Sequence, residues 1–199
     1  GALDASTDIT VTASGASTVA NAISVGNTSI TGSSATLNNG TIGGNLTLNA
    51  TAGDIGSNGT VTVGGAIDLD ATDTIRFTDL AANGGDFTID AGNETIFGTA
   101  LASGAITVDA AVGIQFNEIT STGSSISLTS GEAIFGGNLN AATTLDMSAI
   151  TIVANNASAG TSASIVSDTL DFASIEAPLI SLNGLLDVTV DSLTGDAID

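Results

Sequence analysis

The chain has 199 residues, 42% of them hydrophobic, and sets 21 acidic residues against a single basic one, Arg76, for a formal net charge of −20. A chain this long and apolar can bury a core, which argues against disorder. Its charge opposes binding to nucleic acid or to anionic membranes, because those surfaces attract Lys and Arg, and it favours a positive partner or a divalent cation instead. The chain has no Cys and therefore no disulfide or thiolate site.

Neither a membrane helix nor a signal peptide is expected in this sequence. No stretch reaches the roughly 18 consecutive apolar residues that a membrane-spanning helix requires. The first residues lack the basic start and apolar run of a signal peptide. We therefore expect either that a signal was removed or that the chain is an internal piece of a longer protein.

Short segments of one pattern follow each other through the middle of the chain. Each alternates apolar and polar residues over about five positions, as a half-buried strand does. Their starts lie 19 to 21 residues apart, so the chain contains a repeat of about 20 residues. The segments are GNLTLNA (44–50), GAIDLDA (65–71), GDFTIDA (85–91), GAITVDA (104–110), SSISLTS (124–130) and TTLDMSA (143–149).

A second apolar run follows the first within each unit, which gives three apolar stations per repeat. Twenty residues are too few for an immunoglobulin-like sandwich, and no apolar stripe of helical period is present. The pattern predicts an all-β parallel β-helix, or β-solenoid, with about 20 residues per coil. The second runs are DTIRFTDL (73–80), ETIFGTAL (94–101), VGIQFNEI (112–119) and EAIFGGNL (132–139).

Equivalent residues of successive coils should stack into columns that form the core. Counting from Ile9 to Leu186 predicts about nine coils, and at about 4.8 Å per coil a rod roughly 45 Å long. We expect a single solenoid domain over 1–199, with its clearest repeats in 44–149 and irregular coils in 1–43 and 150–199, where loops are inserted or corners are shifted. The first predicted core column is Leu46, Ile67, Phe87, Ile106, Ile126 and Leu145.

The repeated Gly-x-Ile-x-Leu-x-Ala phrase, the Ala, Gly, Thr, Ser, Asn and Asp bias and the lack of Lys and Cys carry a family resemblance. The chain resembles the haemagglutinin-type repeats of large bacterial exoproteins, such as the filamentous haemagglutinin-like adhesins of two-partner secretion or an autotransporter passenger. The resemblance covers 44–149 best. It implies a right-handed β-helix outside a Gram-negative cell or on its surface. No Asn-Pro-Asn-Leu motif of the family's secretion domain is present, which favours an internal rod fragment.

Bulky and small residues alternate between neighbouring coils in the second runs. An inward column of Phe77, Gly98, Phe116 and Gly136 would let each ring lie over a glycine. The neighbouring outward column would then expose Phe97 and Phe135, which predicts a contact with another chain, another rod or a flanking loop. A local bulge that turns both rings inward is the alternative.

One outward column combines three carboxylates on successive coils, Asp70, Asp90 and Asp109. Charges about 5 Å apart repel each other, and Ca²⁺ would offset that repulsion because it binds carboxylate, carbonyl and water oxygens. Calcium is a possible ligand, although neither a calcium nonapeptide repeat nor an EF-hand loop is present. A solvated column with side chains fanned apart is the alternative, and the fold requires no cofactor.

We expect a structural protein without enzymatic activity, namely an extracellular rod or filament such as an adhesin shaft. Its partners would be adjacent coils of the same rod or other copies of the chain, including copies stacked end to end. The alternative is a binding module for a host or cell-surface receptor or for Ca²⁺, with its site on a long loop in 150–168 or 26–44. A polysaccharide-active β-helix enzyme is a remote alternative, because chance carboxylate pairs abound but no Trp or Tyr could stack a sugar ring.

Overall fold

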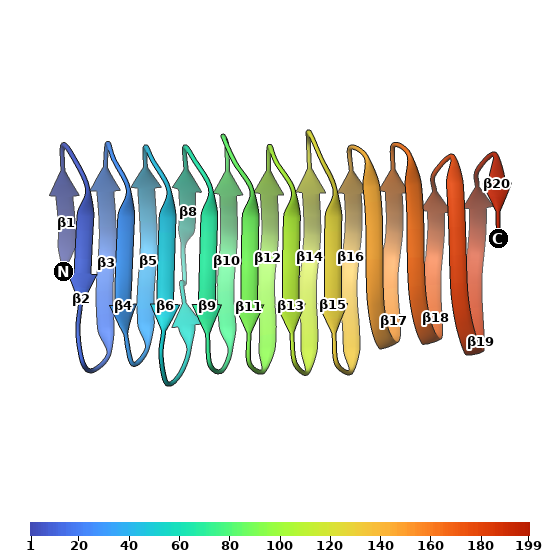
Figure 1. Ribbon diagram of the computed structural model, residues 1–199, viewed down its shortest axis with the longest axis horizontal. Helices are drawn as coiled ribbons and strands as arrows, with labels where there is room; N and C mark the ends of the chain where they lie inside the picture. Colours follow the sequence, from blue (N-terminus) through green and yellow to red (C-terminus); the bar gives the residue numbers. More distant parts are fainter.

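The computed structural model describes residues 1–184 and 186–199 and shows a right-handed parallel β-solenoid (Figure 1). Strands that run in one direction form one layer, and strands that run in the opposite direction form the second layer behind it. The solenoid has about 10 turns of roughly 19 residues, close to the nine coils of 20 that the repeats predict. At about 4.8 Å per coil the rod is roughly 48 Å long.

Over the described residues the chain forms 20 strands, and each pairs in parallel with the equivalent strand of the next coil. In chain order they are β1 Ala2–Ala5, β2 Ile9–Thr12, β3 Ser17–Ser24, β4 Thr28–Gly32, β5 Ala35–Ile42, β6 Leu46–Ala50, β7 Ile55–Gly56, β8 Thr60–Val63, β9 Ile67–Ala71 and β10 Ile75–Ala82. They continue with β11 Phe87–Ala91, β12 Glu94–Ala102, β13 Ile106–Ala110, β14 Gly113–Ser121, β15 Ile126–Ser130, β16 Ala133–Ala141, β17 Thr144–Ala159, β18 Ser162–Glu176, β19 Leu179–Thr194 and β20 Ala197–Ile198.

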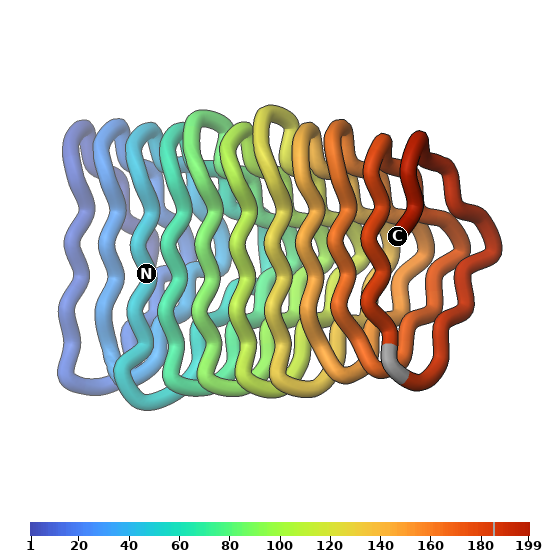
Figure 2. The backbone as a smooth tube through the Cα atoms, turned by 45° about the vertical axis from the view of Figure 1, so that its right-hand side comes forward, coloured from blue at the N-terminus to red at the C-terminus, as the bar shows by residue number. Residues whose placement is uncertain are grey.

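One layer is a flat side built from short strands with strict alternation. In β9, β11 and β13 the first, third and fifth residues are buried and the others are exposed. The predicted core column from Leu46 to Leu145 is confirmed, since each of its members pairs with the next one. Figure 2 shows the resulting stack, in which the backbones of successive coils run as parallel waves along the whole rod.

The other layer is bent, which creates the two remaining sides of each coil. In β10 and β12, Phe77 pairs with Phe97 and Asp79 pairs with Thr99, but the residues between them, Thr78 and Gly98, do not pair. The burial pattern changes phase at these unpaired residues, because a corner there turns the chain around the core. The stretch before this corner is called the second side and the stretch after it the third side. The three predicted apolar stations are therefore the three sides of the coil.

Glycines in the turns allow stacked coils to approach closely. A Cβ on Gly64 would collide with the carbonyl oxygen of Gly43 in the preceding coil, and a Cβ on Gly84 would collide with that of Gly64. No described residue in these turns or elsewhere has a positive φ angle. The physical requirement is close backbone contact between coils rather than left-handed geometry.

The coils near the carboxyl end are shorter than the central ones. The core column continues from Leu145 to Ala163, Ile180 and Ile198, at intervals of 18, 17 and 18 residues. The count of coils from Ile9 to Leu186 treated Leu186 as a core residue, which is wrong, since its side chain is 83% exposed. Loop insertions or shifted corners were expected here, whereas the coil intervals of 17 and 18 residues show shorter turns.

One central coil also differs by a residue from its predicted alignment. Thr95, and not Ile96, pairs with Ile75 on one side and Ile114 on the other. This shift turns Ile96 toward the outer surface and makes Leu101 40% exposed. A one-residue slip moves every following side chain of a strand to the opposite face.

Candidate functional site

The carboxylate column on the flat side has the predicted arrangement. Asp90 pairs in register with Asp70 on one neighbouring coil and with Asp109 on the other, and all three are exposed. Asn49 extends the column, and its Nδ2 donates a hydrogen bond of 3.3 Å to Oδ2 of Asp70. The column thus presents three successive acidic side chains to solvent.

This column does not form a closed ligand set. Among the described residues, no three or more His, Cys, Asp or Glu side chains are grouped so that they could hold a metal ion. An in-line column with one carboxylate per coil supplies few oxygens at any one point, whereas Ca²⁺ prefers six to eight. Calcium binding by Asp70, Asp90 and Asp109 stays a prediction.

Phe97 and Phe135, the predicted contact residues, differ in their exposure to solvent. Phe97 is only 3% exposed and stacks on Phe116 inside the solenoid, with ring centroids 6.1 Å apart and an interplanar angle of 22°. Its assignment to the outer surface is wrong, because the coil that contains it is one residue shorter than its aligned sequence suggested. Phe135 is 47% exposed, as predicted.

The inner aromatic column differs accordingly. Phe77, Phe97 and Phe116 are consecutive members of this column, so three aromatic side chains follow one another without a glycine between them, and Gly98 lies at the corner instead. The predicted packing of Phe against Gly is confirmed at the next step, where Phe116 covers Gly136. A Cβ on Gly136 would overlap the ring of Phe116.

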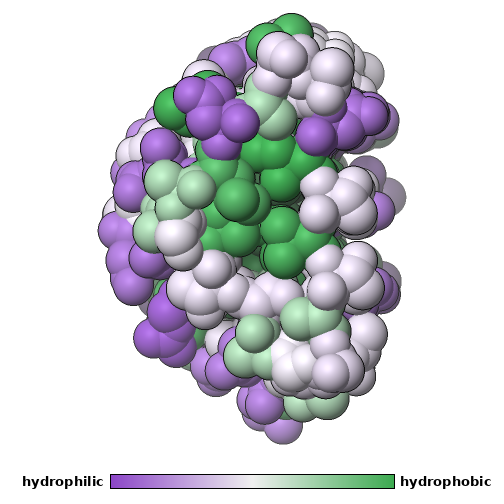
Figure 3. Space-filling view, turned by 90° about the vertical axis from the view of Figure 1, so that its left-hand side faces the viewer, coloured by the Kyte–Doolittle hydropathy of each residue, from purple (hydrophilic) through white to green (hydrophobic). Residues whose placement is uncertain are grey.

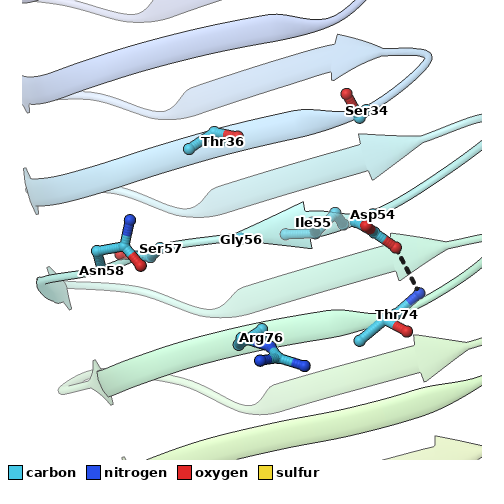
Figure 4. Close-up of a pocket in the computed structure, with 9 residues that line it drawn as sticks. All are labelled: Ser34, Thr36, Asp54, Ile55, Gly56, Ser57, Asn58, Thr74 and Arg76. Carbon is cyan, nitrogen blue, oxygen red and sulfur yellow. Dashed lines mark hydrogen bonds between the residues drawn. The ribbon is translucent and has the colours of Figure 1, made fainter.

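Beside the only Arg of the chain lies a hollow on the second side, shown in Figure 4. Arg76 belongs to β10 and Thr36 to β5, and the short strand β7 runs between them. The hollow has a volume of about 410 Å³ and is lined by Ser34, Thr36, Asp54, Ile55, Gly56, Ser57, Asn58, Thr74 and Arg76.

A local break in the strand ladder creates this hollow. Gly56 pairs with Arg76 and Thr60 pairs with Asp79, so this coil has one residue more between these points than the next coil has. Gly56 carries no side chain to fill the outward station between Thr36 and Arg76. The buried Ser57 follows it in sequence, and its hydroxyl donates a 2.8 Å hydrogen bond to the carbonyl oxygen of Asn38.

The lining of the hollow is polar and carries one charge of each sign. Oδ1 of Asp54 accepts a 3.1 Å hydrogen bond from the backbone N–H of Thr74, as the dashed line in Figure 4 shows. The guanidinium of Arg76 is exposed and can pair with a carboxylate in a planar, bidentate geometry. The arrangement suits recognition of an acidic group better than chemistry on it.

Sequence reasoning placed the irregular coil elsewhere. The long binding loop expected in 150–168 or 26–44 is absent, since β17 and β18 run through 144–176 with a break of two residues, and β4 and β5 with short turns cover most of 26–44. The signal that could have located the hollow is the phrase GSNG at 56–59, which has a polar residue where most other coils have an apolar one.

A ladder of side-chain caps in one turn was also missed. Oδ1 of Asp8, Asn27 and Asn45 each accepts a hydrogen bond of 2.7 to 2.9 Å from a backbone N–H of the next coil. Asp86 repeats the contact with the N–H of Ala105 at 2.8 Å. These Asn and Asp residues satisfy turn donors that no strand pairs, so their role is structural.

Comparison with protein-family models, curated proteins and solved structures finds no match to this chain. Over the described residues, no helix has the length and apolar character needed to span a membrane.

Proposed function

We propose that the chain is a structural rod segment, the shaft of a bacterial surface exoprotein of the haemagglutinin-like kind, and that it works outside the cell. The observation that supports this proposal is the continuous parallel ladder, which links each coil to its neighbours from β1 to β20. In such a solenoid, stability is approximately a sum over coils and their interfaces. Length can therefore be extended without changing the core.

The ends of the ladder support end-to-end stacking as part of the same proposal. Among the described residues, β1 pairs only with β3 and β2 pairs only with β4, so one edge of each is unpaired there. Figure 3 shows apolar atoms in the centre of that end, where Leu3, Ala5 and Val11 are only partly buried. Open strand edges over apolar side chains favour pairing with a further coil or with the end of another copy.

Electron microscopy and proteolysis of the purified chain test the rod proposal. We expect straight rods about 48 Å long or whole-number multiples of that length, and slow cleavage within 1–184. Leu69→Asp, at a buried position, should abolish both properties, whereas Thr88→Asp, at an exposed position of the neighbouring strand, should leave them intact. Round particles or rapid cleavage throughout the wild-type chain would contradict the proposal.

The hollow beside Arg76 favours a second candidate, a binding module for acidic groups. Its test is binding of a carboxylate-rich glycan or peptide by the wild-type chain and loss of that binding in Arg76→Gln. Unchanged binding in Arg76→Gln would remove this candidate. A surface location predicts that an antibody raised against the purified chain labels intact source cells, while an internal location predicts labelling only after the cells are permeabilised.

A further inference from the structure

The outward column of the second side differs in charge from the flat side. It carries one cation and one anion, Arg76 and Asp171, whereas the flat side presents Asp68, Asp146 and the three carboxylates of its column. Consecutive pairings define its members, which are Thr18, Thr36, Gly56, Arg76, Ile96, Gln115, Phe135, Val153, Asp171 and Thr189. This column is called the second-side stripe.

Apolar side chains occupy the stripe between its two charges. Phe135 is 47% exposed, and Ile96 and Val153 are partly exposed. Arg76 and Asp171 are separated by five coil steps, or about 24 Å at about 4.8 Å per step. An exposed apolar patch bounded by charges of opposite sign is typical of a contact surface.

The second-side stripe of one copy is complementary to the stripe of a second copy that runs in the opposite direction. A two-fold axis across the rod, between Gln115 and Phe135, sets Arg76 opposite the partner's Asp171. The same axis sets Ile96 opposite the partner's Val153 and Phe135 opposite the partner's Gln115. Because the contact is isologous, each pair occurs twice.

We propose that two copies of the chain associate side by side, with antiparallel rods, through this stripe. A parallel arrangement would set Arg76 against the partner's Arg76 and Asp171 against the partner's Asp171, which is unfavourable. Neighbouring outward residues also fit the antiparallel order, since Gly113 faces the partner's Ala133 and Glu94 faces the partner's Thr151. Farther from the axis, Asp54 faces the partner's Asp187, and this like-charge pair, which also occurs twice, weakens the contact.

The stripe is narrow, so the association is weak. The axis overlaps the eight coils from Gly56 to Thr189. Eight coils of about 4.8 Å and a contact about 12 Å wide bury roughly 460 Å² per copy, below the typical 800 Å² of a stable complex. Each copy also carries a net charge of −20, and the resulting repulsion is screened only by salt. We therefore expect reversible dimers at high protein concentration and physiological ionic strength.

Sedimentation velocity over a range of concentrations tests the proposal by charge reversal. Arg76→Asp alone and Asp171→Arg alone should each weaken dimerisation about tenfold or more, because two pairs become repulsive. An equimolar mixture of the two variants should dimerise again, since both pairs are then opposite in sign. The double variant R76D/D171R should dimerise as the wild type does.

Two control variants distinguish this lateral contact from a general effect of net charge and from end-to-end stacking. Asp146→Arg makes the same charge change as Asp171→Arg, but at an exposed position of the flat side. It should leave lateral dimerisation no weaker than in the wild type. Phe135→Ser should weaken dimers without changing the net charge. End stacking gives longer polymers, not discrete dimers, and is unaffected by these variants, so the two associations can fail independently. A wild type that stays monomeric, or a mixture of the single variants that stays monomeric, would overturn the proposal.

Discussion

Thr95 is a polar residue in a core column that is otherwise aliphatic from Ala35 to Leu170. Its side chain is fully buried between Ile75 and Ile114, and its hydroxyl oxygen has no hydrogen-bond partner. A buried hydroxyl without a partner costs free energy, because it has lost its hydrogen bonds to water. The central core therefore contains an internal weak point that its repeat pattern does not reveal.

Replacing Thr95 with Val should stabilise the protein. Val has nearly the same shape and removes the unpaired hydroxyl, so the free energy of unfolding should rise by about 1 kcal/mol and Tm by roughly 2–4 °C. Thermal unfolding followed by circular dichroism measures the change. Thr88→Val, on the exposed flat side, is the matched control and should change Tm little. A lower Tm for Thr95→Val would show that the hydroxyl has a partner.

Gly136 accommodates the ring of Phe116 from the neighbouring coil. Gly136→Ala should lower the free energy of unfolding by about 1–3 kcal/mol, since the new methyl group has no space. Gly113→Ala is the control, because a Cβ there would have no neighbour closer than 3.8 Å. Phe116→Leu in the Gly136→Ala background should recover part of the loss, and strictly additive effects in urea unfolding would contradict this contact.

At the scale of the strand, the column of Asp70, Asp90 and Asp109 can act on stability in two ways, and repulsion and calcium binding predict different changes in Tm. If the three carboxylates only repel one another, Asp90→Asn should raise Tm by about 1–2 °C in chelator. If they bind calcium, added Ca²⁺ should raise Tm of the wild type and raise it less in Asp90→Asn. Thr88→Asn, one outward station away on β11, is the uncharged control. Scanning calorimetry in calcium and in chelator distinguishes the two, and an unchanged wild-type Tm removes the calcium hypothesis.

The register of single strands was the part of the fold that the sequence predicted least well. In β12 the sequence ETIFGTAL aligns with DTIRFTDL of the preceding coil, yet the observed pairing is shifted by one residue. Both alignments place apolar residues at two inward stations, so the local pattern does not distinguish them. The structure buries Phe97 at the cost of exposing Leu101, because stacking on Phe116 retains the larger apolar surface inside.

At the scale of the whole molecule, the net charge of −20 opposes the compact state. Raising NaCl from about 10 mM to about 150 mM shortens the screening length from roughly 30 Å to roughly 8 Å. Tm should therefore rise with salt, since only Arg76 could lose an attractive pair. The measurement is Tm against ionic strength at constant pH, with a neutral osmolyte as the control. A Tm that falls with added NaCl would contradict repulsion as the dominant electrostatic effect.

The repeat of about 20 residues, the strands of the flat side and their core columns were determined by the sequence itself. The alternation of apolar and polar residues within a strand and the repeat between coils both indicate which residues are buried. Leu46, Ile67 and Ile106 could therefore be placed in the core from the sequence. The Asp column followed from the same register. These features depend on the period alone.

Only the tertiary structure decided the length of each turn and, with it, which residues lie on the second and third sides. Turns have no apolar pattern, and a difference of one residue there reverses inside and outside for the strand that follows. Phe97, Leu101 and Leu186 were misplaced for this reason, and the hollow beside Arg76 arises from a single additional residue. The second-side stripe, and the contact proposed for it, emerge only when the coils are stacked in their observed register.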